Sequence, residues 1–300
     1  MAFNRAAGYN NLPSGAFSPV IYSQKVLKFF RKASVVEDIT NTDYYGEIAN
    51  FGDTVKIIRE PTLTVTPYTR GTTVNPQDLA DDELSLTVDK ANYFAFKVDD
   101  IEQKQAHLNW ESLATSSGAY AIRDGYDTEV LSHISGQVLT ANQYGTGGSP
   151  LDLGHEPTDT ATPLQAMNRI VRLMDANNVP AENRWFVAGP LFWEQMRDEN
   201  SKLMGVDFTG DSNSILRNGL VTNGLIRGFR CYQSNNLPLD SSNNVALAGH
   251  MSAVATASQI SKVETFRDPD SFADVVRGLH MYGRKVLRTE GVYKIVYSID

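Results

Sequence analysis

The spacing of apolar residues predicts one long helix between residues 99 and 136. Apolar positions recur there mostly at intervals of three, four or seven residues, at Leu108, Trp110, Leu113, Ile122, Tyr126, Val130 and Ile134. Asp99 and Glu102 predict a capping box at its start, and Gly136 predicts a left-handed cap at its end. Unbroken, this helix would span roughly 50 Å at about 1.5 Å per residue. Because globular helices average about 11 to 12 residues, we expect it to be the spine of the fold.

A break within residues 114–118 is the alternative. Ser116, Ser117 and Gly118 are poor residues for a helix interior, and a glycine there costs roughly 1 kcal/mol. We favour one continuous helix, because an isolated glycine is tolerated within a periodic apolar pattern.

Polar and apolar residues alternate before this helix, which predicts strands. The strands are expected at residues 52–58, 62–68, 83–89 and 93–99. Residues 69–82, TRGTTVNPQDLADD, are polar and rich in turn formers, so two long strands are expected to form a hairpin with a protruding tip. Because two strands alone are marginally stable, the hairpin must pack either on its own body or across a neighbouring copy. The polar tip favours an exposed or intermolecular position.

The N-terminal residues predict an arm. Residues 1–20 are rich in Asn, Gly, Pro and Ser, which is typical of an extended segment without its own core. Residues 22–34 have the pattern of a short amphipathic helix. Its apolar residues are Val26, Leu27, Phe29 and Phe30, and its basic residues are Lys25, Lys28, Arg31 and Lys32. The apolar side must cover some surface, and we expect another subunit to supply it.

The second half of the chain predicts a compact α/β or α+β lobe at about residues 145–268. A linker rich in Gly, Pro and Thr leads to Thr162 and Pro163, which predict a helix start. The elements expected beyond that helix are a strand at 184–189, a helix opened by Pro190, strands at 228–234 and 245–250, a short helix at 251–259 and a strand at 260–266. The last strands, at 274–288 and 291–299, are expected to pair with residues 52–57 beside the long helix.

Composition and charge narrow the class of protein. With 41% hydrophobic and 21% charged residues, the 300-residue chain can bury a large core. It has neither an apolar signal-peptide region nor a run long enough to span a membrane, so we expect no membrane partner. The chain has a single cysteine, Cys231, which excludes an internal disulfide and favours synthesis in a reducing cytoplasm. We expect Cys231 to be a thiol buried in the core rather than a nucleophile.

The net charge of −8 opposes a general nucleic-acid-binding surface. Residues 1–36 hold five basic residues and no acidic residue, so they carry +5 and the remainder carries −13. An arm of opposite sign to its body suits docking on neighbouring copies, although a solvated basic helix face explains the same pattern.

No catalytic or cofactor-binding pattern emerges from the sequence. The five histidines are scattered, at His107, His133, His155, His250 and His280. Neither HExxH nor GxSxG occurs, the glycines at 145–148 lack a phosphate-loop ending, and residues 207–214 lack calcium-loop spacing. Asp99 and Asp100 are better explained by helix capping than by a catalytic carboxylate pair. We therefore expect no enzyme activity, no cofactor and no metal site.

The order of these elements resembles that of tailed-bacteriophage major capsid proteins of the HK97 fold. The segments that carry the resemblance are YYGEIANFGDTVKI, YFAFKVDDIEQKQ, RWFVAGP, GFRCYQSNNLP and MYGRKVLRTEG. The resemblance implies an α+β fold and covers nearly the whole chain. The implied parts are an N-terminal arm at 1–40, a first peripheral-domain strand and extended loop at 41–98, a spine helix at 99–144, an axial domain at 145–268 and returning peripheral-domain strands at 269–300.

The resemblance implies a structural function. Many copies would assemble as hexamers and pentamers into an icosahedral head that encloses double-stranded DNA, touched only weakly and without sequence specificity. Assembly would occur in the host bacterial cytoplasm, with a separate scaffolding protein, a portal and possible decoration proteins, and the product would be the virion capsid. The subunit-contact candidates are Lys25, Lys28, Phe29, Phe30, Arg31, Lys32, Arg70, Asp78, Asp81, Asp82 and Glu83. An encapsulin-like compartment shell and a small hydrolase or ligand-binding protein remain the alternatives.

Overall fold

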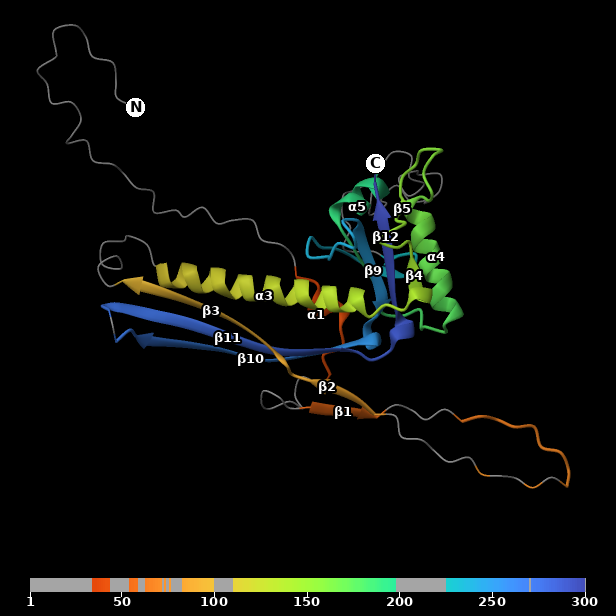
Figure 1. Cartoon of the computed structure of the whole chain (residues 1–300), viewed down its shortest axis with the longest axis horizontal. Helices are drawn as coiled ribbons and strands as arrows, with labels where there is room; N and C mark the ends of the chain where they lie inside the picture. Colours follow the sequence, from red (N-terminus) through yellow and green to blue (C-terminus); the bar gives the residue numbers. More distant parts are fainter. Residues whose placement is uncertain are drawn as a thin grey trace, which may run out of the picture.

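A computed structural model gives the fold, and it describes residues 34–43, 54–58, 63–71, 73, 76, 83–99, 110–197, 225–269 and 271–299, with backbone alone at 110–114 and 259–263. An elongated part consists of a long helix lying along a three-stranded sheet, and a compact lobe sits at one end of it (Figure 1). A thin hairpin extends from the elongated part on the side away from the helix (Figure 1).

Helix α3, Trp110–Gly136, runs without interruption through the Ser and Gly residues at 116–118. The prediction of a continuous helix is therefore confirmed over these residues. The predicted left-handed cap is wrong, because Gly136 is still helical and has no positive φ. Asp99 is the last residue of a strand, and Glu102 lies outside the described residues.

The sheet beside α3 is antiparallel, in the order β10-β11-β3. Its strands are β10, Val254–Arg267, β11, Ala273–Val286, and β3, Lys90–Asp99. The helix predicted at 251–259 is wrong: only the 3-10 turn η2, Met251–Ala253, precedes β10. Alanine has a high helix propensity, so the local sequence favours a helix here. Ala255 and Ala257 are instead buried against Leu86 of another strand, and a contact between such distant segments cannot be predicted from local propensity. The strand predicted at 260–266 is confirmed.

One aromatic ring joins α3 to this sheet. A Cβ placed on Gly118 of α3 would lie 2.7 Å from Phe94 of β3, and one on Gly278 of β11 would lie 2.3 Å from the same ring. The ring thus fills the space left by two missing side chains, one on the helix and one on the neighbouring strand. This explains why a poor helix former is tolerated at position 118.

The hairpin consists of β1, Thr54–Ile58, and β2, Glu83–Thr87, paired antiparallel. Its base packs on the body, where Leu86 and Val88 are buried against β10. The strand predicted at 62–68 is wrong, since residues 63–69 form no strand and are all exposed. Figure 1 shows this loop projecting far from the rest of the chain. The hairpin is thus anchored at its base, and residues 63–70 of its loop are exposed.

The compact lobe is built on a seven-stranded mixed sheet in the order β4-β12-β9-β6-β8-β7, with β5 also paired to β12. The strands are β4, Gln143–Tyr144, β5, Leu151–Asp152, β6, Arg184–Ala188, β7, Leu225–Ile226, β8, Phe229–Gln233, β9, Asn244–His250, and β12, Val292–Ser298. The 3-10 turns η1, Thr140–Asn142, and η3, Thr289–Gly291, precede β4 and β12.

Two helices cover this sheet, α4, Pro163–Ala176, and α5, Pro190–Arg197. The predicted start of α4 is confirmed, and Thr162 and Gln165 complete a capping box there. Met167, Ile170 and Met174 are fully buried on one side of α4, as the periodicity predicts. They pack with aromatic residues of β6 and α5 into the core of the lobe.

The expected pairing of the C-terminal strands with residues 52–57 is wrong. Strand β1 pairs with β2, β11 pairs with β10 and β3, and β12 pairs with β9 in the compact lobe. Six of the seven residues of β12 are buried, which is typical of a strand covered on both faces. The chain thus returns to the elongated part with β10 and β11 and ends in the compact lobe with β12.

We expect Gly118→Ala to lower the free energy of unfolding by about 1–3 kcal/mol, because the new methyl group meets the Phe94 ring. The matched control is Gly125→Ala on the same helix, whose Cβ would lie 3.8 Å from its nearest neighbour, Asn92. That variant is expected to stabilise the helix by up to about 1 kcal/mol. Chemical denaturation of both variants measures the difference, and equal effects would contradict this packing.

Candidate functional site

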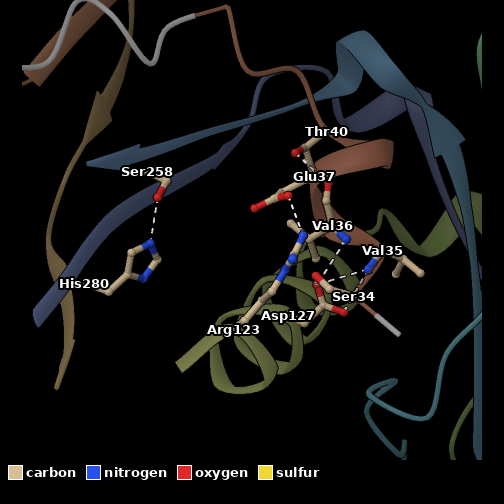
Figure 2. Close-up of polar contacts among 9 residues, drawn as sticks. All are labelled: Ser34, Val35, Val36, Glu37, Thr40, Arg123, Asp127, Ser258 and His280. Atoms are coloured by element: carbon tan, nitrogen blue, oxygen red, sulfur yellow. Dashed lines mark hydrogen bonds and ion pairs between the residues drawn. The ribbon is translucent and has the colours of Figure 1, made fainter. Parts of the chain in front are cut away.

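The last residues of the expected arm are anchored on α3 by one buried carboxylate. Asp127 is fully buried and accepts hydrogen bonds from the Ser34 hydroxyl at 2.8 Å and the backbone N–H groups of Val35 and Val36 at 3.2 and 3.1 Å. Figure 2 shows these three donors converging on it. The two N–H groups belong to the start of the short helix α1, Val36–Ile39, where unpaired donors need an acceptor.

Further contacts fix this segment, residues 34–41, which we call the arm root. Arg123 of α3 pairs with Glu37 at 2.7 Å, and the hydroxyls of Thr40 and Thr256 lie 2.8 Å apart (Figure 2 shows Arg123, Glu37 and Thr40). Asn41 forms a parallel bridge with Ala255 of β10. The arm root is therefore part of the folded body, although the sequence assigns residues 34–40 to the arm.

The arm root also joins the two parts of the molecule. Val36 and Ile39 are fully buried in one apolar cluster with Val130 and Ile134 of α3. The same cluster contains Val187 and Leu247, from β6 and β9 of the compact lobe, and other strand residues. Any segment N-terminal to Ser34 therefore starts from a fixed point at the junction of helix, sheet and lobe.

Most of the contact residues predicted from sequence cannot be placed. Those that lie outside the described residues are Lys25, Lys28, Phe29, Phe30, Arg31, Lys32, Asp78, Asp81 and Asp82. Arg70 is exposed in the hairpin loop, and Glu83 begins β2, where it pairs with Lys56 across the hairpin at 2.6 Å. Both partners are exposed, so solvent screens this ion pair and it contributes little to stability. Its position on the hairpin makes Glu83 available to a second copy.

The hairpin loop carries an apolar surface that the sequence analysis did not select. Leu63, Val65 and Tyr68 are all exposed, and Val65 is 93% exposed. The alternation in TLTVTPY predicts a strand, and it is also the pattern that places these apolar side chains along the loop. In the structure these side chains remain largely exposed to solvent.

A second apolar surface lies on the face of the three-stranded sheet opposite α3. Tyr93 of β3 is 79% exposed, and Phe266 and Leu279 lie beside it on β10 and β11. These side chains line a shallow hollow, together with Arg277, whose guanidinium group stacks 5.0 Å from the Phe266 ring centre. We call this the open sheet face. It combines exposed apolar side chains with the ion pair of Arg277 and Glu264, and exposed apolar patches of this kind often mark a contact site.

Among the described residues, no cluster of His, Cys, Asp or Glu side chains could hold a metal ion. No described helix is long and apolar enough to cross a membrane. Cys231 is buried, and burial raises the pKa of its thiol to about 12. A thiol of this kind is a poor nucleophile, which agrees with the core position predicted for it. The polar contacts described here serve to hold segments together.

Comparison with known proteins gives the family. A family profile described as phage capsid protein matches residues 81–295. A solved structure from Mycobacterium phage Che8 is similar, with a TM-score of 0.79 and 29% identity over 94% of this chain and 98% of that chain. A capsid structure of the Cyanophage P-SCSP1u has a TM-score of 0.75 and 18% identity, over 97% of each chain. The capsid of a native GTA particle has a TM-score of 0.69 and 13% identity, over 99% and 100%.

No curated protein sequence matches the chain. The profile nevertheless covers well over half of it, so the chain belongs to the phage capsid protein family. The predicted α+β fold of HK97 type and the predicted function as a major capsid protein are both confirmed. Neither the encapsulin-like nor the hydrolase alternative finds support in these comparisons.

We expect Asp127→Ala to release the arm root, because it leaves two N–H groups and a hydroxyl without their acceptor. The expected loss is about 1–3 kcal/mol in the free energy of unfolding, with faster amide exchange at residues 35–41. The matched control is Thr128→Ala, an exposed neighbour on the same helix. Unchanged exchange in the Asp127 variant would contradict the anchoring role.

Three partly buried histidines predict acid sensitivity. Burial lowers the pKa of His133, His250 and His280 below the ordinary value of 6.5. His280 is stacked on Tyr282 and bonded to Ser258 at 2.7 Å (Figure 2 shows the bond). The unfolded chain binds these protons more readily, so the free energy of unfolding should fall as pH drops below about 6.5.

Thermal or chemical unfolding measured from pH 8 to about pH 5 tests this dependence. His280→Gln removes one titrating group and keeps a polar end, so it should reduce the loss of stability at low pH. A pH profile identical to that of the natural sequence would contradict a role for His280.

Proposed function

We propose that this chain forms the shell of a tailed-phage head, in which hexamers and pentamers close into an icosahedron around double-stranded DNA. One observation carries the proposal: the apolar side chains of the hairpin loop, Leu63, Val65 and Tyr68, are largely exposed. A neighbouring copy could bury them. Matching solved structures that are titled as capsids support the same conclusion.

The loop and the open sheet face form a complementary pair. Leu63, Val65 and Tyr68 offer apolar side chains, and Tyr93 and Phe266 offer an apolar surface. If the loop of one copy covers the open sheet face of the next, each contact repeats around a ring. A contact of this head-to-tail kind closes into rings when its rotation permits, as hexamers and pentamers require.

The arm supplies a second kind of contact in this proposal. Residues 1–36 carry +5 against −13 for the rest of the chain, so charge favours docking of an arm on a neighbouring body. Lys25, Lys28, Arg31 and Lys32 would provide the attraction, with Phe29 and Phe30 as apolar anchors. At the hairpin tip, Arg70, Asp78, Asp81, Asp82 and Glu83 would pair with opposite charges on neighbouring copies.

The remaining partners are proposed from the family resemblance. We propose a separate scaffolding protein, a portal and possible decoration proteins, with assembly in the host bacterial cytoplasm. The net charge of −8 allows only weak, non-specific contact with packaged DNA. The domain division is proposed as well, with three changes. Strand β10 is grouped with the peripheral part, because it pairs with β11 beside α3. Strand β12 is grouped with the axial part, because it pairs with β9 in the compact lobe, and the arm root is grouped with the body.

Deletion of residues 1–33 tests the arm and keeps the arm root intact. The natural chain should elute from size-exclusion chromatography as large particles that electron microscopy shows to be closed shells. The truncated chain should give soluble subunits or aberrant assemblies, because it lacks the basic amphipathic segment. Normal shells from the truncated chain would count against the arm, and small globules from the natural chain would count against the proposed function.

A further inference from the structure

Three consecutive residues of β11, Tyr282, Gly283 and Arg284, lie where the hairpin meets the body. Strand β2 ends at Thr87, and the chain turns through residues 88–89 into β3. A Cβ placed on Gly283 would lie 2.4 Å from the backbone oxygen of Thr87. The end of β2 therefore passes directly over β11, at a distance that only glycine permits.

Arg284 connects this crossing to two other elements. Its guanidinium forms an ion pair with Glu129 of α3 and lies 3.8 Å from the carboxylate of Asp89, which follows β2. The arginine side chain is only 13% exposed, whereas Asp89 is 56% exposed. A largely buried guanidinium is thus held between the spine helix and the root of the hairpin.

Tyr282 completes the junction. Its ring packs edge-to-face against Tyr126 of α3 at 4.9 Å, and its hydroxyl accepts a hydrogen bond from Asn92 of β3 at 3.4 Å. Burial, together with the nearby charge of Glu129, raises the pKa of this hydroxyl to about 12. It therefore stays neutral and places no second charge beside Arg284.

We propose that Gly283 and Arg284 are positioning residues that set the direction in which the hairpin loop leaves the body. The proposal rests on the proposed function, in which that loop contacts the next copy. The hydrophobic contacts between the hairpin base and β10 are not directional, so by themselves they would allow the hairpin to slide or tilt. A close backbone contact and a directional ion pair remove that freedom, so the loop reaches its neighbour at a set angle.

The energetics agree with a positioning role. Replacing a buried ion pair by apolar groups is often nearly neutral for stability, so such pairs are better explained by the arrangement that they select. Here the pair joins Glu129 of α3 to Arg284 of β11, which are far apart in the sequence, and Asp89 connects the hairpin root to the same guanidinium group. Loss of Arg284 should therefore loosen the hairpin more than it destabilises the whole chain.

The test compares Arg284→Met with Arg267→Met. Arg267 pairs with Asp274 across β10 and β11 at 3.3 Å, at the end of these strands away from the hairpin crossing. Amide exchange at residues 54–58 and 83–87 should become about tenfold faster in the Arg284 variant and stay unchanged in the control. Electron microscopy should then show fewer closed shells and more irregular assemblies for the Arg284 variant alone.

Gly283→Ala gives an independent test, because it displaces β2 sterically and keeps every charge. If Arg284→Met does not fold, this variant replaces it in the same measurements. Unchanged exchange at the hairpin, or normal shells despite a loosened hairpin, would overturn the positioning role. Failure of the natural chain to form shells would instead overturn the proposed function, so the two failures are distinguishable.

Discussion

The structure depends on the packing of α3 against the three-stranded sheet. Phe94 fills the space between Gly118 and Gly278, and Tyr126 packs edge-to-face on Tyr282. Because the helix and sheet are both long, this contact gives the chain a rigid axis. Every segment that could reach another copy starts from this axis or from the lobe at its end.

Two devices attach the outward segments to that axis. Asp127 holds the arm root by accepting hydrogen bonds at the start of α1, and the Gly283 and Arg284 junction holds the hairpin base. Both attachments combine apolar burial with directional polar contacts. Burial supplies most of the attraction, and the polar contacts select one geometry, because hydrogen bonds tolerate little change in angle.

The same layout leaves apolar surface uncovered. Val65 on the hairpin loop and Tyr93 on the open sheet face are both largely exposed. A head-to-tail contact would bring the loop of one copy onto the sheet face of the next. Large apolar patches on a folded chain usually mark sites of protein contact. In a phage capsid protein, the copies themselves are the natural source of that contact.

The sequence by itself determined the continuous helix through residues 116–118, the start of α4 and the two strands that form the hairpin, because these follow from local periodicity, capping and alternation. The capsid-like order of elements was indicated by resemblance to a known family. Only the tertiary structure decided the strand partners of β1, β10 and β12, since pairing depends on contacts between distant segments. The same holds for Asp127, whose role depends on donors more than ninety residues away in the chain. A pattern along one segment cannot report which distant backbone groups it will meet.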